Sequence, residues 1–271
     1  MKKIILDDCV ISNLMTDYQN GESIPNLSKK YVINTRTISN VLKDNGIQIR
    51  GRRRIFYNEN FFEKIDSKLK AYWLGFLFAD GCVRDIKGGY VLKIKLSTLD
   101  ENHLMSFICH IESNQKELRT ETSKFKGSNG KQYESTGKVL LVNSKKIVKD
   151  LVKLGCGQNK TNNIEFPKIK DELIPSFILG YFDGDGCITQ KKVKGSTYYS
   201  VTFTSGSENF LIRVKNELLN FGLESVSKYD YKTFYRLQIS NKIDLVKIKS
   251  YFYSKNNFFL ERKKIKFDKL C

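Results

Sequence analysis

Residues 71–83, AYWLGFLFADGCV, and residues 176–188, SFILGYFDGDGCI, are two copies of one segment, and they decide the fold. Each residue of the first copy has its counterpart 105 positions later, and one Leu, two Gly, one Asp and one Cys are identical in both. The similarity continues downstream, where STLDENHL at 97–104 matches TSGSENFL at 204–211. A unit of about 100 residues that occurs twice predicts two similar structural units in one chain.

Within each unit the residue pattern predicts the order helix, strand, strand, helix, strand, strand, helix. Alternation supports the strands, because Leu92, Ile94 and Leu96 would point to one side of a sheet and the residues between them to the other. Antiparallel sheets with helices on one face make an α+β protein. The other face would be polar and basic, and its candidates for contact with DNA are Lys93, Lys95, Thr202, Thr204, Arg236 and Gln238.

The repeated helix is nearly all apolar, so it is expected to be buried on most sides. Gly75 and Ala79 are four residues apart, and so are Gly180 and Gly184. This spacing places two small residues on one face of each helix, where two backbones can approach closely. We therefore expect the two repeated helices to pack against each other about a pseudo-twofold axis.

Asp80 and Asp185 end these helices, and each is followed by a helix-ending glycine, Gly81 or Gly186. A carboxylate at a helix C-terminus meets the negative end of the helix dipole, and two such carboxylates side by side repel each other. No Lys or Arg is adjacent in either motif. A hard divalent cation, Mg²⁺ or Mn²⁺, is the simplest compensation, with these four residues as its candidate ligands. Paired carboxylates, a metal and a basic surface together indicate phosphodiester hydrolysis.

The composition favours a polyanionic partner. Lys and Arg number 47 against 29 Asp and Glu, which gives a net charge of +18. An anionic membrane surface would also suit this charge, but no stretch approaches the roughly 20 apolar residues of a membrane span. The N-terminal residues do not resemble a signal peptide. Scattered cysteines without a CxxC pair argue against a zinc site and favour a reducing compartment. The cytoplasm is the expected location and a bacterial or phage gene the expected source, with an organelle as the open alternative.

Residues 1–56 read as a separate helical module with a basic linker. Asp7 or Asp8 and then Ser23 can cap two helices, and a third runs from about Thr35 to Asn45. The last two helices, joined by a tight turn, predict a helix-turn-helix. The expected DNA-contacting residues are Arg36, Thr37, Asn40 and Lys43 of the third helix and Arg52, Arg53 and Arg54 of the linker.

The two motifs WLGFLFADG (73–81) and ILGYFDGDG (178–186) resemble those of the LAGLIDADG homing endonucleases, and the resemblance covers about residues 60–271. It implies two pseudo-symmetric αββαββα units, at 57–165 and 166–271, that form a saddle over double-stranded DNA as a monomer. It further implies Asp80 and Asp185 as the Mg²⁺ ligands. The earlier motif acid of the family is present as Asp183 but replaced by Phe78 in the first unit.

Active members of that family also carry a lysine near each catalytic centre, after the last helix of each unit. The resemblance points to Lys160 in the first unit and to Lys263, or alternatively Lys264, in the second. Other functions stay open at this point. A transcription regulator of this fold usually loses the acidic pair, which this chain keeps, whereas an RNA maturase would keep the whole fold. A pure DNA-binding module is the third alternative.

Overall fold

The computed structural model describes residues 6–51, 55–86, 89–127, 130–157 and 164–269. It divides into two compact units, Met1–Arg54 and Ile55–Cys271. The division falls two residues before the expected boundary. Phe56 explains the difference, because its backbone N–H and carbonyl both bond to Asn114 of the larger unit.

The smaller unit contains three helices, α1 (Asp8–Gln19), α2 (Ile24–Tyr31) and α3 (Thr35–Asp44). Leu14, Tyr18, Leu27, Ile38 and Leu42 form a core of their own. Asp7, Ser23 and Asn34 cap the three helices with their side chains. The three helices and the caps at Asp7 and Ser23 are those that the sequence predicts, whereas the Asn34 cap was not predicted. The helix-turn-helix function of α2 and α3 stays a prediction.

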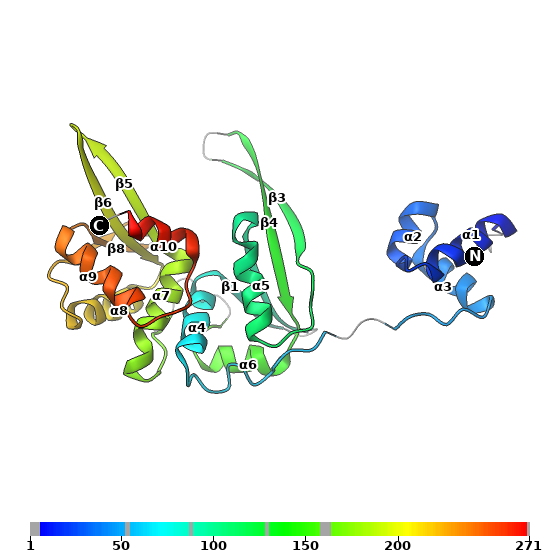
Figure 1. Cartoon of the computed structure of the whole chain (residues 1–271), viewed down its shortest axis with the longest axis horizontal. Helices are drawn as coiled ribbons and strands as arrows, with labels where there is room; N and C mark the ends of the chain where they lie inside the picture. Colours follow the sequence, from blue (N-terminus) through cyan, green and yellow to red (C-terminus); the bar gives the residue numbers. More distant parts are fainter. Residues whose placement is uncertain (1–5, 52–54, 87–88, 128–129, 158–163, 270–271) are drawn as a thin grey trace. The chain divides into compact units, whose positions relative to one another are not determined.

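The larger unit consists of two similar halves, each with the order αββαββα (Figure 1). The first comprises α4 (Lys68–Asp80), β1 (Gly81–Ile86), β2 (Gly89–Ser97), α5 (Glu101–His110), β3 (Arg119–Lys126), β4 (Gln132–Val142) and α6 (Lys145–Lys153). The second comprises α7 (Ile174–Asp185), β5 (Cys187–Val193), β6 (Ser196–Ser205), α8 (Glu208–Asn220), β7 (Ser227–Asp230), β8 (Tyr235–Ile239) and α9 (Lys242–Tyr253). This confirms the α+β class and the pseudo-symmetric units. An additional helix, α10 (Glu261–Asp268), ends the chain's described part.

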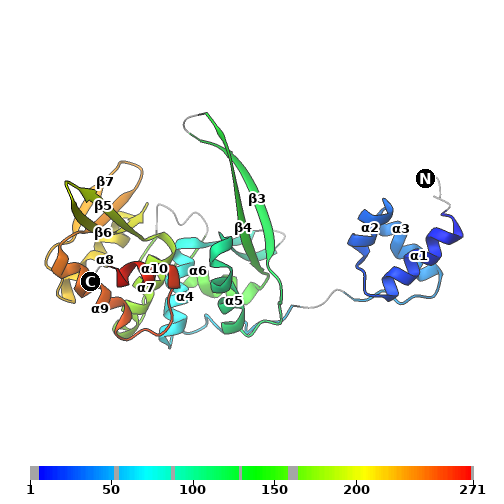
Figure 2. The same cartoon turned by 45° about the horizontal axis from the view of Figure 1, so that its top comes forward.

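Each half builds one antiparallel four-stranded sheet, in the orders β1-β2-β4-β3 and β5-β6-β8-β7. Leu92 and Ile94 are fully buried, whereas Lys93 and Lys95, which alternate with them along β2, are half-buried. Helices α5 and α6 lie on the buried side of the first sheet (Figure 2). The alternation read from the sequence is therefore correct, and within the described residues no helix covers the face of the first sheet that carries Lys93 and Lys95.

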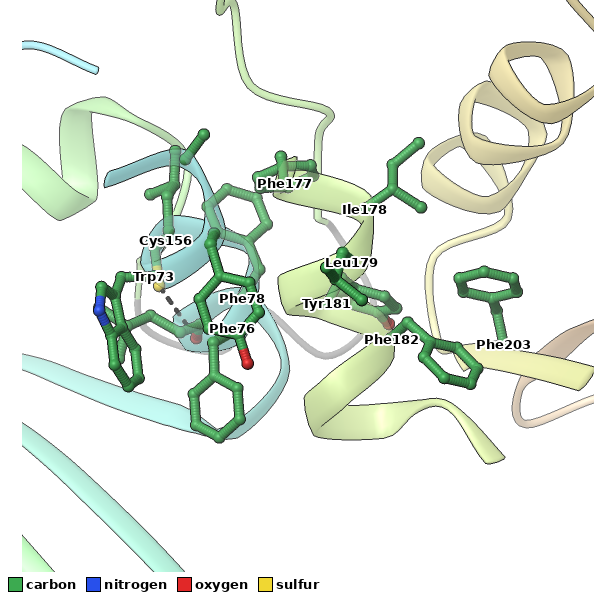
Figure 3. Packing of buried hydrophobic residues seen from close by; sticks show 14 of the residues in the cluster. Trp73, Phe76, Phe78, Cys156, Phe177, Ile178, Leu179, Tyr181, Phe182 and Phe203 are labelled. Atoms are coloured by element: carbon green, nitrogen blue, oxygen red, sulfur yellow. Dashed lines mark hydrogen bonds between the residues drawn. The ribbon is translucent and has the colours of Figure 1, made fainter. Parts of the chain in front are cut away.

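The centre of the larger unit is the contact between α4 and α7, among the buried aromatic side chains of Figure 3. A Cβ added to Gly75 would lie 1.9 Å from the carbonyl oxygen of Phe177, and one added to Gly180 would lie 1.9 Å from that of Tyr72. The two clashes are equivalent under the repeat, because Gly180 lies 105 positions after Gly75 and Phe177 lies 105 positions after Tyr72. The predicted close pairing about a pseudo-twofold axis is confirmed.

We expect Gly75→Ala and Gly180→Ala each to lower the free energy of unfolding by about 1–3 kcal/mol or more, because the helices must separate to admit one methyl group. Urea denaturation followed by the fluorescence of the single tryptophan, Trp73, measures the free energy of unfolding of the larger unit, in which Trp73 lies. Gly89→Ala is the control, since its Cβ would meet nothing within 4 Å. Equal urea midpoints for all three variants would disprove the helix contact.

Candidate catalytic centre

The motif helices end at Asp80 and Asp185, the last residues of α4 and α7. Gly81 and Gly186 follow with φ angles of −78° and −76°, so neither takes the left-handed conformation common for a glycine after a helix. Space explains these glycines instead, because a Cβ at either would come within 2.6 Å of the preceding helical turn. Each helix therefore leads directly into the first strand of its sheet.

The Asp80 carboxylate lies against the second motif helix. A Cβ on Gly184, the neighbour of Asp185, would lie 3.2 Å from Asp80 Oδ2 and 2.3 Å from the Ala79 Cβ. Burial raises the pKa of Tyr181, and the nearby charges of Asp185 and Asp80 raise it further. Asp80 and Asp185 thus both lie near Tyr181, at two helix C-termini whose dipoles add negative potential.

Lys263 of α10, the lysine that the family resemblance indicates for the second centre, lies at the end of α7. Its Nζ donates to the carbonyl oxygens of Phe182 (2.5 Å), Gly184 (3.2 Å) and Gly186 (2.6 Å) at the end of α7. The residue is 4% exposed, and burial lowers the pKa of its amine to about 8, although nearby carboxylates oppose the shift. No Lys or Arg adjoins either motif in the sequence, and this lysine reaches the end of α7 from a segment that is remote in sequence.

The other lysine candidates stand differently. Lys264 points away from the motif and forms an exposed ion pair with Asp268 at 2.6 Å. Lys160 lies outside the described residues. At the matching position of the first motif helix, the carbonyl oxygen of Leu77 accepts a bond from the buried Cys156 thiol at 3.4 Å. Cys156 was not singled out from the sequence, and no motif marks it.

The donor set at the helix ends fits a hard divalent cation. Asp80 and Asp185 offer carboxylate oxygens, which Mg²⁺ takes together with water and phosphate oxygens. In the ranges that the structure describes, no group of three or more His, Cys, Asp or Glu residues could hold a metal ion. The Gly186 carbonyl already accepts from Lys263, so Gly81 is the better placed of the two candidate carbonyl ligands.

Asp183, the earlier acid of the second motif, is fully buried and ties three segments together. Its Oδ2 accepts from the Tyr72 hydroxyl and from the Leu260 N–H, both at 2.7 Å. The Tyr72 hydroxyl also lies 3.0 Å from Nε2 of His103. Burial raises the pKa of Asp183 to about 7. Phe78, at the equivalent position of the first motif, instead packs edge-on against an aromatic ring of α7.

On the helix-free face of the first sheet, the expected DNA-contacting lysines are partly neutralised. Lys93 Nζ lies 2.7 Å from Glu121, and Lys95 Nζ lies 2.6 Å from Ser123 Oγ and 3.5 Å from Glu121. The Glu121 carboxylate therefore lies between the two lysines, and this face holds hydrogen-bond acceptors as well as donors. Such a mixture can distinguish bases rather than only attract phosphates.

The second sheet places its four candidates on one face, since Thr202 pairs with Gln238 and Thr204 with Arg236 in the strand register. Thr202 is only 9% exposed and donates to a neighbouring backbone carbonyl, so it is the least accessible of the four. The Arg236 guanidinium lies over the ring of Tyr231 at 5.0 Å, which restrains its direction.

In the small unit, Arg36, Asn40 and Lys43 of α3 are exposed and Thr37 is half-buried. Arg52, Arg53 and Arg54 lie outside the described residues. Arg50, which begins the same basic tract, folds back onto the module, where its guanidinium lies 4.1 Å from the Tyr18 ring and bonds to backbone carbonyls. The start of this tract is therefore part of the module's own structure.

Residues 172–252 match the family model of the LAGLIDADG-like domain. Among curated proteins, the chain is 26% identical over 203 residues to the replication factor C small subunit of Methanocaldococcus jannaschii. The aligned stretch covers 71% of this chain and 10% of that protein. It is 28% identical over 190 residues to the probable translation initiation factor IF-2 of the same organism, covering 66% and 14%. The chain thus spans about a tenth of the length of these relatives.

Among solved structures, the chain is similar to the homing endonuclease I-WcaI bound to its DNA recognition sequence, with a TM-score of 0.50 and 13% identity over 76% of this chain and 91% of that one. It is similar to the meganuclease I-SmaMI bound to uncleaveable DNA, with a TM-score of 0.50 and 15% identity over 76% and 90%. At such identities the likeness establishes the fold. No helix in the described part of the chain is long and apolar enough to cross a membrane.

The two neighbouring lysines of α10 give a matched test of the centre. Lys263→Met should lower the free energy of unfolding by about 1–3 kcal/mol, because buried carbonyl oxygens lose their donor. Lys264→Met removes an ion pair with the exposed Asp268 and a contact with the Tyr253 ring, and it should change the free energy of unfolding by less than about 1 kcal/mol. Urea denaturation with Trp73 fluorescence compares them. Equal effects would show that Lys263 does not hold the end of α7.

Proposed function

We propose that this chain, which belongs to the LAGLIDADG family by its paired motifs, its matching domain and its fold, is a site-specific endonuclease that cuts both strands of duplex DNA. The observation that carries the proposal is that the two helices packed at Gly75 and Gly180 both end in an aspartate, and that the Asp80 carboxylate lies against the second motif at Gly184. Both Asp80 and Asp185 therefore end at the negative ends of neighbouring helix dipoles, where carboxylate oxygens are placed to share a cation.

Asp80 and Asp185 would hold Mg²⁺ or Mn²⁺. When bound, such an ion neutralises charge on the phosphate and activates water for attack on the phosphodiester. Lys263 has a positioning part in this account, because it fixes the last turn of α7 and thereby the direction of Asp185. Lys160, the family-based candidate of the first unit, is proposed for the equivalent centre.

The polar faces of the two sheets would bind the DNA, with the helices on their other faces as support. A net charge of +18 favours binding of a polyanion, and polar side chains on strands can read base edges in the major groove. Among the proposed reading residues, Lys93, Lys95 and Arg236 are half-buried and Thr202 is buried.

Two relatives with unrelated names contain a similar stretch of about 200 residues that makes up 10% and 14% of their length. A module that recurs within otherwise different proteins is what a mobile, self-inserting gene would leave. This supports a homing role, in which cleavage at one site initiates insertion. The alternatives are an RNA maturase and a DNA-binding regulator or module of the same fold. Binding assays with duplex DNA and structured RNA in parallel distinguish the maturase, and Mg²⁺-dependent nicking of a plasmid distinguishes the regulator or module.

The catalytic assignment predicts that Asp80→Asn and Asp185→Asn each abolish double-strand cleavage and retain DNA binding, because a neutral amide is a poor Mg²⁺ ligand. The measurement is Mg²⁺-dependent cleavage of a randomised duplex library, followed by sequencing of the products. Asp85→Asn, which removes an exposed carboxylate of β1, is the control and should still cut. Full cleavage by both motif variants would refute the assignment.

The module assignment predicts that deletion of residues 1–54 weakens DNA binding without abolishing cleavage at saturating protein. A second tethered site raises the effective concentration of the first, and each lost phosphate contact should reduce the salt dependence by a slope of about 0.9. Footprinting and a salt titration of the truncated chain measure both effects. An unchanged footprint length and salt slope would show that the module does not contact DNA.

A further inference from the structure

The first turn of α10, the helix that lies beside α7 in Figures 1 and 2, carries two adjacent basic residues that bond to different halves of the larger unit. Arg262 donates from Nε to both carboxylate oxygens of Asp100, at 2.8 and 3.0 Å, and Asp100 lies between β2 and α5 of the first half. Lys263 donates to the end of α7 in the second half. Because consecutive residues of a helix lie about 100° apart around its axis, one turn of α10 reaches both halves.

Asp100 is a buried carboxylate that does not serve its own helix. It precedes α5 as the N-cap residue, yet its side chain forms no capping hydrogen bond. Only 6% of the residue is exposed, and a buried carboxylate is costly unless it is paired. In the described part of the chain, Arg262 is the cationic residue that forms an ion pair with it. Separation of the two would leave the carboxylate unpaired, so the pair fixes Arg262 against the first half.

Lys263 uses its whole ammonium group at the end of α7. An ammonium group has three N–H donors, and Nζ of Lys263 lies within 3.2 Å of three carbonyl oxygens, those of Phe182, Gly184 and Gly186. The residue is almost completely buried. Because hydrogen bonds weaken steeply when the donor moves or turns away, this arrangement requires that the first turn of α10 stay in place.

Helix α10 is short, and contacts with both halves hold it. Its eight residues are too few for a stable helix in isolation, and the side chain of its N-cap residue, Leu260, forms no capping hydrogen bond. The Leu260 N–H donates to Asp183, and Phe267 near the other end is buried against aromatic rings of the second half. Arg262 adds a contact from the first turn itself to the first half, one residue before Lys263.

We propose that the Asp100–Arg262 pair positions Lys263 at the end of α7, so that a residue of the first half sets the geometry of the second motif. The inference rests on the proposed function, since it assigns two positioning residues to the proposed cleavage. Both act through Lys263 and the helix end that it holds. The simplest alternative is a pair that merely joins the halves, which would stabilise the folded chain without changing the surroundings of Lys263 within it.

Acylation of the folded full chain by acetic anhydride, followed by mass spectrometry of its peptides, measures how accessible the Lys263 amine is. The double variant Asp100→Asn/Arg262→Met removes both charges and so leaves no unpaired buried carboxylate, and Trp73 fluorescence checks that it folds. Lys263 should be acylated about tenfold faster in this variant, the factor expected from the loss of one charge-assisted hydrogen bond. Arg262→Lys keeps a cation opposite Asp100 and should protect Lys263 better than the double variant does.

Arg213→Met is the matched control. The Arg213 side chain is 47% exposed, as is that of Arg262, but it pairs with Glu217 at 2.7 Å within one helix, α8. Its loss should leave the acylation of Lys263 unchanged. If Lys263 reacts no faster in the double variant than in this control, the pair does not position the lysine and the inference is wrong.

Cleavage is measured on a duplex that the unmodified chain selects from a randomised library by binding without divalent metal. With Mg²⁺ and excess protein, the double variant should cut this duplex at least about tenfold more slowly, because a small displacement in a catalytic centre costs that much or more. Its affinity for the duplex should not change. An unchanged rate, or a loss confined to affinity, would overturn the inference and leave the proposed function standing. If the unmodified chain cuts no selected duplex, the proposed function fails, and acylation alone decides whether the pair positions Lys263.

Discussion

Two backbone contacts hold the larger unit together, Gly75 against the Phe177 carbonyl and Gly180 against the Tyr72 carbonyl. Neither position can take a side chain, since even a methyl group would overlap the opposing oxygen. Because the contacts are equivalent, the two halves pack about a pseudo-twofold axis that passes between α4 and α7. The same axis brings Asp80 toward the second motif and sets one sheet on each side. The candidate catalytic centre is thus a consequence of how two helices pack.

The two halves have diverged where they meet the polar groups at this axis. The second motif carries Asp183, which binds Tyr72 and the Leu260 N–H, while the first carries Phe78, which packs against aromatic rings. The Lys263 ammonium donates to the last turn of α7, and the Cys156 thiol donates to that of α4.

The C-terminal segment of the second half also reaches across to the first. Phe258 packs among the rings of Tyr72, Trp73 and His103, and Arg262 forms an ion pair with the buried Asp100 at 2.8 Å. Lys263 follows directly, so the segment that joins the halves also delivers the lysine to α7. Integrity of the first half and the position of Asp185 are linked through these residues.

The sequence predicted what depends on local periodicity and on the repeat. Alternation at Leu92–Leu96 located a strand and its faces, and the paired small residues located the helix contact. It could not predict contacts between residues far apart in the chain, such as Lys263 with Phe182 or Asp183 with Tyr72, because no spacing rule connects them. For the same reason the compensation at Asp185 was assigned wholly to a metal. The ion pair between Asp100 and Arg262 joins residues 162 positions apart, so it too is visible only in the folded chain.

Anomalous diffraction from crystals of the chain with its selected duplex and Mn²⁺ tests the central claim most directly. The account predicts manganese at the ends of α4 and α7, with carboxylate oxygens of both Asp80 and Asp185 as ligands and the DNA phosphates completing the site. Manganese bound elsewhere, or helix ends too far apart for the two aspartates to reach a common site, would contradict it.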